Sequence, residues 1–186
     1  MELFWRTGYE GTSLHDLLRE LGISRSSLYT VYPSKKALFL RSFAHYLESI
    51  GMQAFRPLHT GREGEGDDEP RDRIARVFDI VIDQVSGDPL HRGCLMVNTI
   101  TEMAGRDEEI DRATGAAQEA VRGMFRRALE PLVESGHKDA ETAEADADFL
   151  LSMFVGLRVR ARNGITREAA RATVERGLRS VFGRNA

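Results

Sequence analysis

Cysteine is nearly absent from this 186-residue sequence, which holds Cys94 and no other. A single cysteine excludes an intramolecular disulfide framework. The sequence also lacks a run of about 18 apolar residues, the length that a membrane-spanning helix needs, and no charged-then-apolar leader opens it. We therefore expect a cytoplasmic protein without a membrane partner.

The residue patterns of common catalytic centres are missing as well. We find no Ser-His-Asp order, no metal-ligand spacing and no glycine-rich phosphate loop. The five histidines, at positions 15, 45, 59, 91 and 137, show no paired spacing on one helix. The sequence therefore predicts a protein that is not an enzyme and that needs neither a cofactor nor a metal.

The chain lacks a large excess of charge of either sign, but its charges are unevenly distributed. The formal net charge is −3, and apolar residues make up 41% of the chain, which suits a folded globular protein. Residues 1–56 hold seven Lys and Arg against five Asp and Glu, whereas the remainder holds 19 against 24. A mildly basic N-terminal part on an acidic remainder is compatible with local binding to phosphates.

Residues 11–39 carry the strongest local pattern. Thr12 and Ser13 are good helix N-caps, and leucines follow at helical spacing until Gly22, which can end the helix in a left-handed conformation. Ile23 is expected to insert into the core. Ser24 then caps a second helix, over about residues 25–31, before Pro33 stops it.

This second helix is short and polar, and only Leu28 and Val31 are expected to face inward. Such a helix gains little from burial, and its composition suits hydrogen bonds to phosphates and base edges. Two helices joined by a tight turn can place the second one in a DNA major groove. The alternative interpretation is an ordinary helical hairpin with a solvated face.

The residues in and around this pattern resemble a known family. The segments GYEGTS (8–13), LGIS (21–24), SLY (27–29) and YPSKKALF (32–39) strongly resemble the N-terminal domain of the TetR/AcrR family of bacterial one-component regulators. The resemblance implies an all-α protein of about nine helices, in which helix 4 joins a three-helix helix-turn-helix head to a helical ligand-binding and dimerisation body. It also implies a homodimer, a double-stranded operator DNA and a small, largely apolar inducer.

By position, the resemblance assigns DNA contacts to eight residues: Thr12, Ser24, Arg25, Ser26, Ser27, Tyr29, Thr30 and Lys35. Arg25 and Ser26 would be the variable readers, and Lys35 would bind a phosphate. The sequence departs from the family at Thr30 and Val31, where polar or aromatic residues are common. Its first helix, around Leu3, has about two turns at most, so we expect lower stability than in an N-terminally extended chain.

The domain boundaries follow from composition and periodicity. We predict a DNA-binding domain over residues 1–46 and a ligand-binding and dimerisation domain over 47–186, with a flexible acidic linker at 57–70. Further helices are expected over about 35–55, 71–85, 93–103, 107–135, 139–162 and 166–182, and no strands are expected.

The body is expected to hold a ligand cavity between its helices. The candidate lining residues are Phe78, Ile82, Met96, Asn98, Thr99, Glu102, Phe125, Phe149 and Met153. The last two helices have broad apolar faces, which are either core or, by the resemblance, a four-helix dimer interface. The candidate residues of this dimer interface are Phe154, Leu157, Val174, Leu178 and Val181.

Three functional hypotheses follow. The leading one is a ligand-responsive regulator, most simply a repressor that binds palindromic operator DNA as a homodimer and is released by an inducer. A second is a helical interaction protein of the same fold whose DNA binding is weakened or lost. The third is a thiol-based sensor of electrophiles or oxidants through Cys94, near His91 and Arg92, although a buried Cys94 would be an ordinary small apolar residue.

Overall fold

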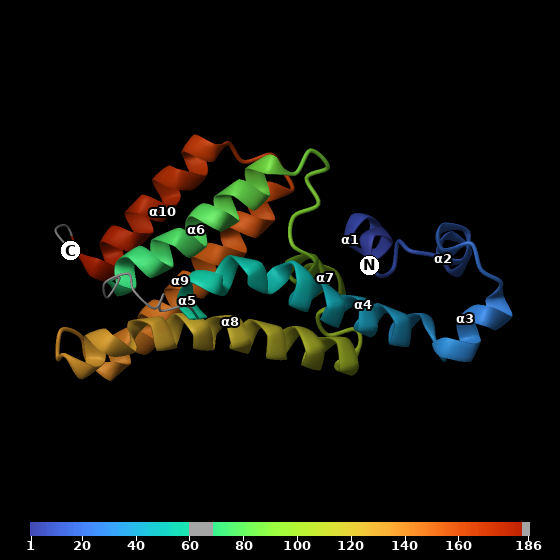
Figure 1. Cartoon of the computed structure of the whole chain (residues 1–186), viewed down its shortest axis with the longest axis horizontal. Coiled ribbons are helices and arrows are strands. Elements are labelled where there is room, and N and C mark those ends of the chain that lie inside the picture. Colours follow the sequence, from blue (N-terminus) through green and yellow to red (C-terminus); the bar gives the residue numbers. More distant parts are fainter. Residues whose placement is uncertain (60–68, 184–186) are drawn as a thin grey trace. The chain divides into compact units, whose positions relative to one another are not determined.

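A computed structural model describes residues 1–59 and 69–183, and in this part of the chain every regular element is a helix (Figure 1). The elements are α1 (Glu2–Thr7), α2 (Leu14–Leu21), α3 (Arg25–Val31), α4 (Lys35–Ser49), the 3-10 helix η1 (Gly51–Phe55), α5 (Arg56–His59), α6 (Pro70–Gly87), α7 (Leu95–Met103), α8 (Glu108–Glu134), α9 (Ala140–Ala161) and α10 (Arg167–Phe182). The predicted all-α fold is confirmed.

Contacts divide the chain into two compact units. The head unit consists of Met1–Gly51 and Cys94–Ala117, and the body unit consists of Met52–Gly93 and Gln118–Ala186. The head unit thus contains α7 and the first part of α8 in addition to the helix-turn-helix segment. The predicted division at residue 46 does not include this second segment, and it stays a prediction.

One predicted helix differs in detail from the observed one. The single helix expected over 35–55 ends at Ser49, and Gly51 begins a separate 3-10 turn. Glycine is a poor helix former, which accounts for the break. In contrast, Pro131 lies inside α8, which continues to Glu134. Most of the predicted acidic linker lies outside the described residues, and Pro70 occupies the first position of α6.

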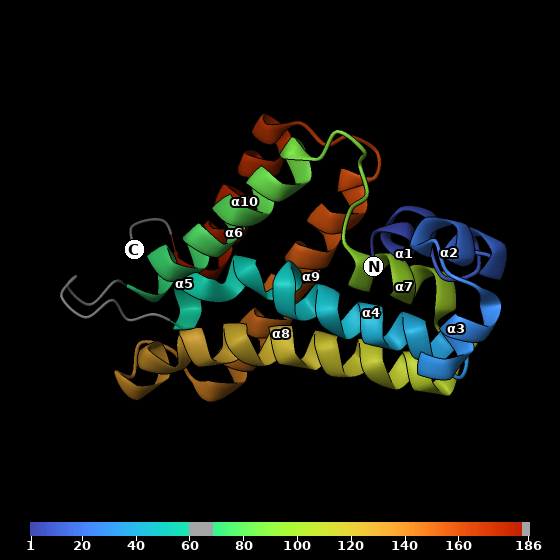
Figure 2. The ribbon, with the colours of Figure 1, turned by 45° about the vertical axis from the view of Figure 1, so that its right-hand side comes forward.

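Aromatic side chains form the core of the head unit. The Phe4 and Phe39 ring centroids lie 5.2 Å apart, and those of Trp5 and Tyr46 lie 5.0 Å apart, both pairs edge to face. Helices α1 and α4 both pack on α7, and Figure 2 shows α7 beside α1. Burying each such ring contributes roughly 1.5–3 kcal/mol, so even the six-residue α1 is firmly attached.

In the body unit, α6 packs against α5, α9 and α10, and both ribbon views show α6 beside α10. Its centre is a second aromatic cluster, in which Phe125 lies 5.6 Å from Phe55 and 5.8 Å from Phe78 between ring centroids. Phe154 belongs to the same cluster, because its ring centroid lies 5.3 Å from that of Phe55. No described helix is both long and apolar enough to cross a membrane.

Candidate DNA-binding site

Local capping fixes the geometry of α2. The Ser13 hydroxyl accepts a hydrogen bond from the Asp16 N–H (3.1 Å), and Asp16 accepts one from the Ser13 N–H (3.3 Å). The hydrogen bond from the Ser13 hydroxyl also lowers the pKa of Asp16. At the other end, Gly22 has φ 64°, the left-handed conformation predicted for it. These two caps set where the turn into α3 begins.

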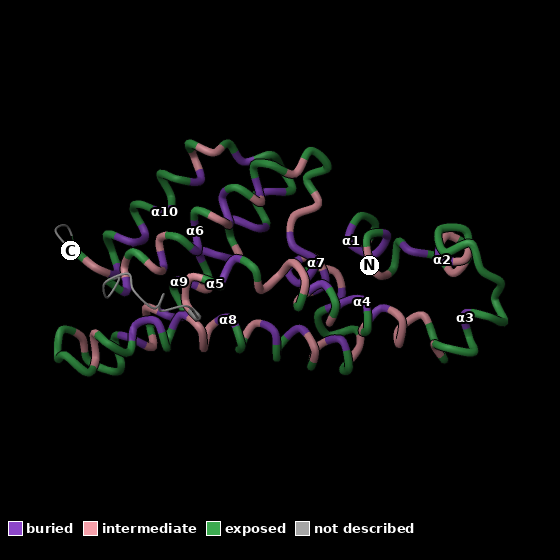
Figure 3. Tube along the Cα trace, in the orientation of Figure 1, coloured by how far each residue is buried: buried purple, intermediate pink, exposed green. Residues whose placement is uncertain are grey.

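Helix α3 is exposed except for one residue. Ser24 caps it by accepting a hydrogen bond from the Ser27 N–H (3.1 Å), and Leu28 is its buried residue, at 3% exposure. The tube in Figure 3 is green along most of α3. Val31 and Ile23 were expected to face inward, but they are 68% and 40% exposed. Both expectations were wrong: a helix of seven residues presents only one narrow stripe, around Leu28, to the core, and Ile23 lies in the exposed turn before α3.

Most of the predicted DNA contacts lie on the exposed surface of α3: Ser24, Arg25, Ser26, Ser27, Tyr29 and Thr30 are all exposed. The Arg25 guanidinium lies 5.5 Å from the Tyr29 ring centroid, and the Thr30 hydroxyl donates to the Ser26 carbonyl (2.9 Å). The structure therefore brings these six residues together on one short helix, with Arg25 and Tyr29 on the same face.

Two predicted contacts lie outside α3. Lys35 is half-buried at the start of α4, with its Nζ 4.4 Å from the Tyr9 ring centroid. Thr12 is fully buried, and its hydroxyl donates to the Gly8 carbonyl (2.6 Å) and pairs with the Thr7 hydroxyl (2.7 Å). Thr12 was predicted to contact DNA. Its side chain is instead buried, where its hydrogen bonds hold the α1–α2 turn.

A carboxylate from α7 holds the same turn from the other side. Glu102 accepts hydrogen bonds from the backbone N–H groups of Tyr9 (2.9 Å) and Glu10 (2.8 Å). Gly8 has φ 79°, and a Cβ there would lie 2.6 Å from Glu102 Oε2. Glu102 was predicted to contact a ligand. Its carboxylate instead anchors the α1–α2 loop, which the sequence did not indicate.

A second polar link ties the start of α4 to the start of α8. Lys36 Nζ lies 3.0 Å from Asp107 Oδ2 and 3.2 Å from Glu109 Oε2. The hydrogen bonds to these carboxylates raise the pKa of Lys36, and the bond from Lys36 lowers the pKa of Asp107. We call this link and the Glu102 anchor together the clasp of the head unit. The sequence analysis missed Lys36 because its partners lie about 70 residues further along the chain.

The predicted ligand-binding residues are divided between the two units. Met96, Asn98, Thr99 and Glu102 belong to the head unit, and Phe78, Ile82, Phe125, Phe149 and Met153 to the body unit. Within the head unit, buried Thr99 donates its hydroxyl to the Leu95 carbonyl (2.7 Å). Phe149 is 43% exposed on α9, which does not fit a buried cavity wall. That these nine residues form one cavity stays a prediction.

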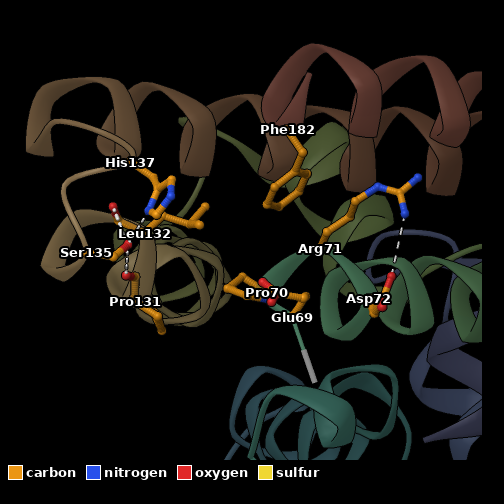
Figure 4. Close-up of a pocket in the computed structure, with 9 residues that line it drawn as sticks. All are labelled: Glu69, Pro70, Arg71, Asp72, Pro131, Leu132, Ser135, His137 and Phe182. Carbon is orange, nitrogen blue, oxygen red and sulfur yellow. Dashed lines mark hydrogen bonds and ion pairs between the residues drawn. The ribbon is translucent and has the colours of Figure 1, made fainter. Parts of the chain in front are cut away.

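Described residues of the body unit line a cavity at each of two places. One of about 640 Å³, between the ends of α6, α8 and α10, is drawn in Figure 4, and none of the predicted ligand-binding residues lines it. Two pairs of its polar residues interact, since Arg71 lies 3.6 Å from Asp72 and His137 shares a hydrogen bond with Ser135 (2.8 Å), while the buried Nε of Arg71 has no hydrogen-bond partner. The other, of about 590 Å³ between α6 and α10, includes Ile82.

The predicted dimer residues do not form a free surface. All five are at most 6% exposed in the single chain: Phe154, Leu157, Val174, Leu178 and Val181. Their apolar stripe packs into the body unit itself, which fits the alternative of an ordinary core, and a role in a dimer stays a prediction. The large apolar residues of α9 that are exposed are Phe149 (43%) and Val159 (45%).

Cys94 is 3% exposed and immediately precedes α7. Arg92, which was expected to act on the thiol, forms an ion pair with Asp88 (3.2 Å). Burial of Cys94 fits the interpretation as a small apolar core residue. The sensor hypothesis stays a prediction.

Comparisons with known proteins match both parts of the chain. The family model described as "Bacterial regulatory proteins, tetR family" matches residues 1–41, and the model "Tetracyclin repressor-like, C-terminal domain" matches residues 70–181. The chain is similar to the HTH-type transcriptional regulator YezE of Bacillus subtilis, with 29% identity over 79% of this chain and 73% of YezE. It is also similar to the HTH-type transcriptional repressor ComR of Escherichia coli, with 25% identity over 90% of this chain and 78% of ComR.

Among solved structures, the chain is similar to the TetR family transcriptional regulator CifR, in cysteine-substituted form and in complex with a 26-bp double-strand operator DNA. The TM-score is 0.82 and the identity 31%, over 96% of this chain and 91% of CifR. The aligned part includes the helix-turn-helix segment, and CifR is bound to duplex DNA in that structure.

Proposed function

We propose that this chain, which belongs to the TetR family of bacterial regulatory proteins, represses transcription as a homodimer on a palindromic operator and leaves it when a small ligand binds. It is a transcriptional regulator. The observation that carries the proposal is the exposed polar surface of α3, a seven-residue helix whose one buried side chain is Leu28. Because its target is DNA, we place its action in the cytoplasm.

In this proposal, α3 lies in the major groove. Arg25, positioned on the Tyr29 ring, can donate two hydrogen bonds to a guanine edge, and Ser26 and Thr30 can reach neighbouring bases or phosphates. Exposed Val31 offers methyl groups that suit contact with a thymine methyl. Lys35 supplies a phosphate contact, which fixes register but not sequence.

We propose a dimer face on the exposed sides of α9 and α10. Phe149, Ser152, Gly156 and Val159 form one exposed stripe of α9, at helical spacing. The stripe combines two apolar side chains with two small residues, and small residues allow helices to approach closely. Gly177 has another role: a Cβ there would lie 2.5 Å from Met153 Sδ, so it permits α10 to pack on α9 within one chain.

A two-fold axis at this face would place two copies of α3 on successive major grooves, about 34 Å apart. The operator should therefore be palindromic. Release requires a ligand that binds more tightly to a form whose two α3 helices no longer match the half-sites. The clasp supports a route for this change, because a shift of α7 would act directly on the α1–α2 loop through Glu102.

The test is a fluorescence anisotropy titration of the full chain against duplexes that tile the DNA flanking its own gene. We expect one duplex to bind with two chains per palindrome and with an affinity that falls steeply as salt rises. If no duplex binds at low salt, the regulator proposal fails and the interaction-protein hypothesis is favoured.

The dimer face has its own test. Val159→Glu places a charge in the proposed interface, so we expect a monomer by light scattering and weak operator binding. The matched control is Arg112→Glu, an exposed position of α8 in the head unit, which should stay dimeric. A dimeric Val159→Glu would place the interface elsewhere.

A further inference from the structure

One arginine of the body unit is buried without a charge to match it. Arg158, on α9, is 4% exposed. Its Nη2 donates a hydrogen bond to the Gln84 side-chain carbonyl, and its guanidinium lies 5.1 Å from the Phe154 ring centroid. Its buried Nε has no hydrogen-bond partner, and in the described parts of the chain Arg158 forms no ion pair.

This arrangement is costly for an unliganded protein. A guanidinium stays charged at any ordinary pH, and burying a charge is expensive unless an opposite charge and hydrogen bonds compensate for it. Gln84 is neutral and satisfies one of the five N–H donors, and the face of Phe154 compensates only in part. Arg158 therefore presents a planar fork of donors that a bidentate anion would satisfy.

Another arginine of the body unit shows what ordinary pairing looks like in this chain. Arg122, on α8, lies 2.6 Å from Asp148 and also pairs with Glu144, and its hydrogen bonds to these carboxylates raise its pKa. It is more exposed than Arg158 and yet has two carboxylates. Among the described residues, Arg158 is thus buried more deeply than Arg122 and has no carboxylate partner.

The apolar surroundings indicate the rest of such a partner. Phe154, which lies against the Arg158 guanidinium, also packs at 5.3 Å on Phe55, and Phe55 packs on Phe125. A ligand with its anionic group at Arg158 would thus meet an aromatic cluster with its remaining atoms. A carboxylate provides two oxygens at the spacing that a guanidinium fork prefers.

We propose that the ligand controlling this regulator is a monocarboxylate with an aromatic or long aliphatic body, and that Arg158 binds its carboxylate. This inference rests on the proposed function, which requires a ligand, and it narrows the expected apolar inducer to an apolar acid. The competing explanation is a purely structural Arg158 that links α9 to α6 through Gln84.

The experiment compares acids with their neutral amides by calorimetric titration of the full chain. The probes are 2-naphthoate and decanoate, each against its primary amide, because the amide keeps the apolar body and removes the charge. The variants are Arg158→Met, which keeps the apolar length, and Arg158→Lys, which keeps the charge without the fork. The matched control is Arg167→Met, because exposed Arg167 also links its helix to α6, through Asp83.

We expect at least one acid to bind the wild type. The amide of that acid should bind the wild type about tenfold or more weakly, and the acid should bind Arg158→Met more weakly by a similar factor. Arg158→Lys should lie between, and Arg167→Met should match the wild type. Without ligand, Arg158→Met should unfold at the same or a higher temperature than the wild type, because the substitution removes the desolvation cost of an unmatched buried charge, which offsets the lost hydrogen bond to Gln84.

Three results would overturn the inference: equal binding of an acid and its amide, an Arg158→Met variant that keeps the acid affinity, or no binding of either acid at millimolar concentration. A clear loss of thermal stability in Arg158→Met would favour the structural explanation. Operator binding is measured without any acid. If the acids fail to bind Arg158, the regulator proposal therefore still stands, and if the operator fails to bind, the anisotropy titration shows this independently of the acids.

Discussion

The head unit and the body unit differ in how they treat charge. In the head unit, Glu102, Lys36 and Asp107 are partly exposed, and each has hydrogen-bond partners from a distant segment. In the body unit, Arg158 is buried beside a neutral amide and an aromatic ring. Both units have aromatic cores, so the units differ in how their charges are paired and not in the kind of side chain at their centres. The difference supports the proposal that Arg158 of the body unit binds an anion.

The largest effect should come from the body core. Phe125→Ala removes a fully buried ring that contacts Phe55 and Phe78, so we expect a loss of about 3–5 kcal/mol in the free energy of unfolding by urea. Tyr29→Ala, at a ring 38% exposed in the head unit, should cost less than about 0.5 kcal/mol and should instead weaken operator binding. Equal stability losses in the two variants would contradict the view that Phe125 belongs to a packed core and Tyr29 to an exposed DNA-binding surface.

The clasp should give an intermediate effect. Glu102→Ala leaves two loop N–H groups without their acceptor, so we expect a stability loss of about 1–3 kcal/mol and weaker operator binding, both measured on the same sample. Gly8→Ala should act in the same direction, because its φ is 79° and its Cβ would meet the Glu102 carboxylate.

Glu108→Ala is the matched control for this prediction. Its side chain is 95% exposed and pairs with Arg112 at 3.8 Å. Such a surface pair contributes little, so the variant should match the wild type in stability and in operator binding. If Glu102→Ala behaves like Glu108→Ala, the loop does not depend on α7.

The smallest effect concerns pH. Hydrogen bonds from Lys36 and from the Ile110 backbone lower the pKa of Asp107, so its stabilising contribution is present above the unfolded pKa, about 3.9, and is lost as pH falls through the folded value. The pKa of Lys36 is raised, so its contribution is present below about 10.4 and is lost as pH rises past the folded value.

We therefore expect the difference in melting temperature between the wild type and Asp107→Asn to be largest at neutral pH and to shrink at both extremes. Thermal unfolding at a series of pH values measures it. A difference that stays constant from acid to alkaline pH would show that the Lys36–Asp107 pair contributes nothing.

The sequence predicted those features that depend on neighbouring residues. The Ser13 and Ser24 caps and the left-handed Gly22 are set within four residues of their partners, and the structure confirms them. The all-α fold and the DNA-binding family were predicted for the same reason, because local motifs identify them.

What the sequence could not predict depends on distant partners. Glu102 bonds to residues about 92 positions earlier, and no local pattern distinguishes that role from a ligand contact. Helix α9 has apolar residues on more than one side, so periodicity alone could not separate its core stripe, with Phe154, from its exposed stripe, with Phe149. Arg158 was missed because an arginine near a helix end usually reaches solvent, as the exposed Arg160 of the same turn does.

The central claim is that α3 reads DNA through Arg25, and one measurement tests it most directly. Anisotropy titrations on the identified operator should show Arg25→Ala weakened by about tenfold or more, with relaxed discrimination at one base pair of each half-site and unchanged melting temperature. Arg112→Ala, another exposed arginine of the head unit, should bind like the wild type. Equal affinity and equal base preference of Arg25→Ala and the wild type would contradict the account.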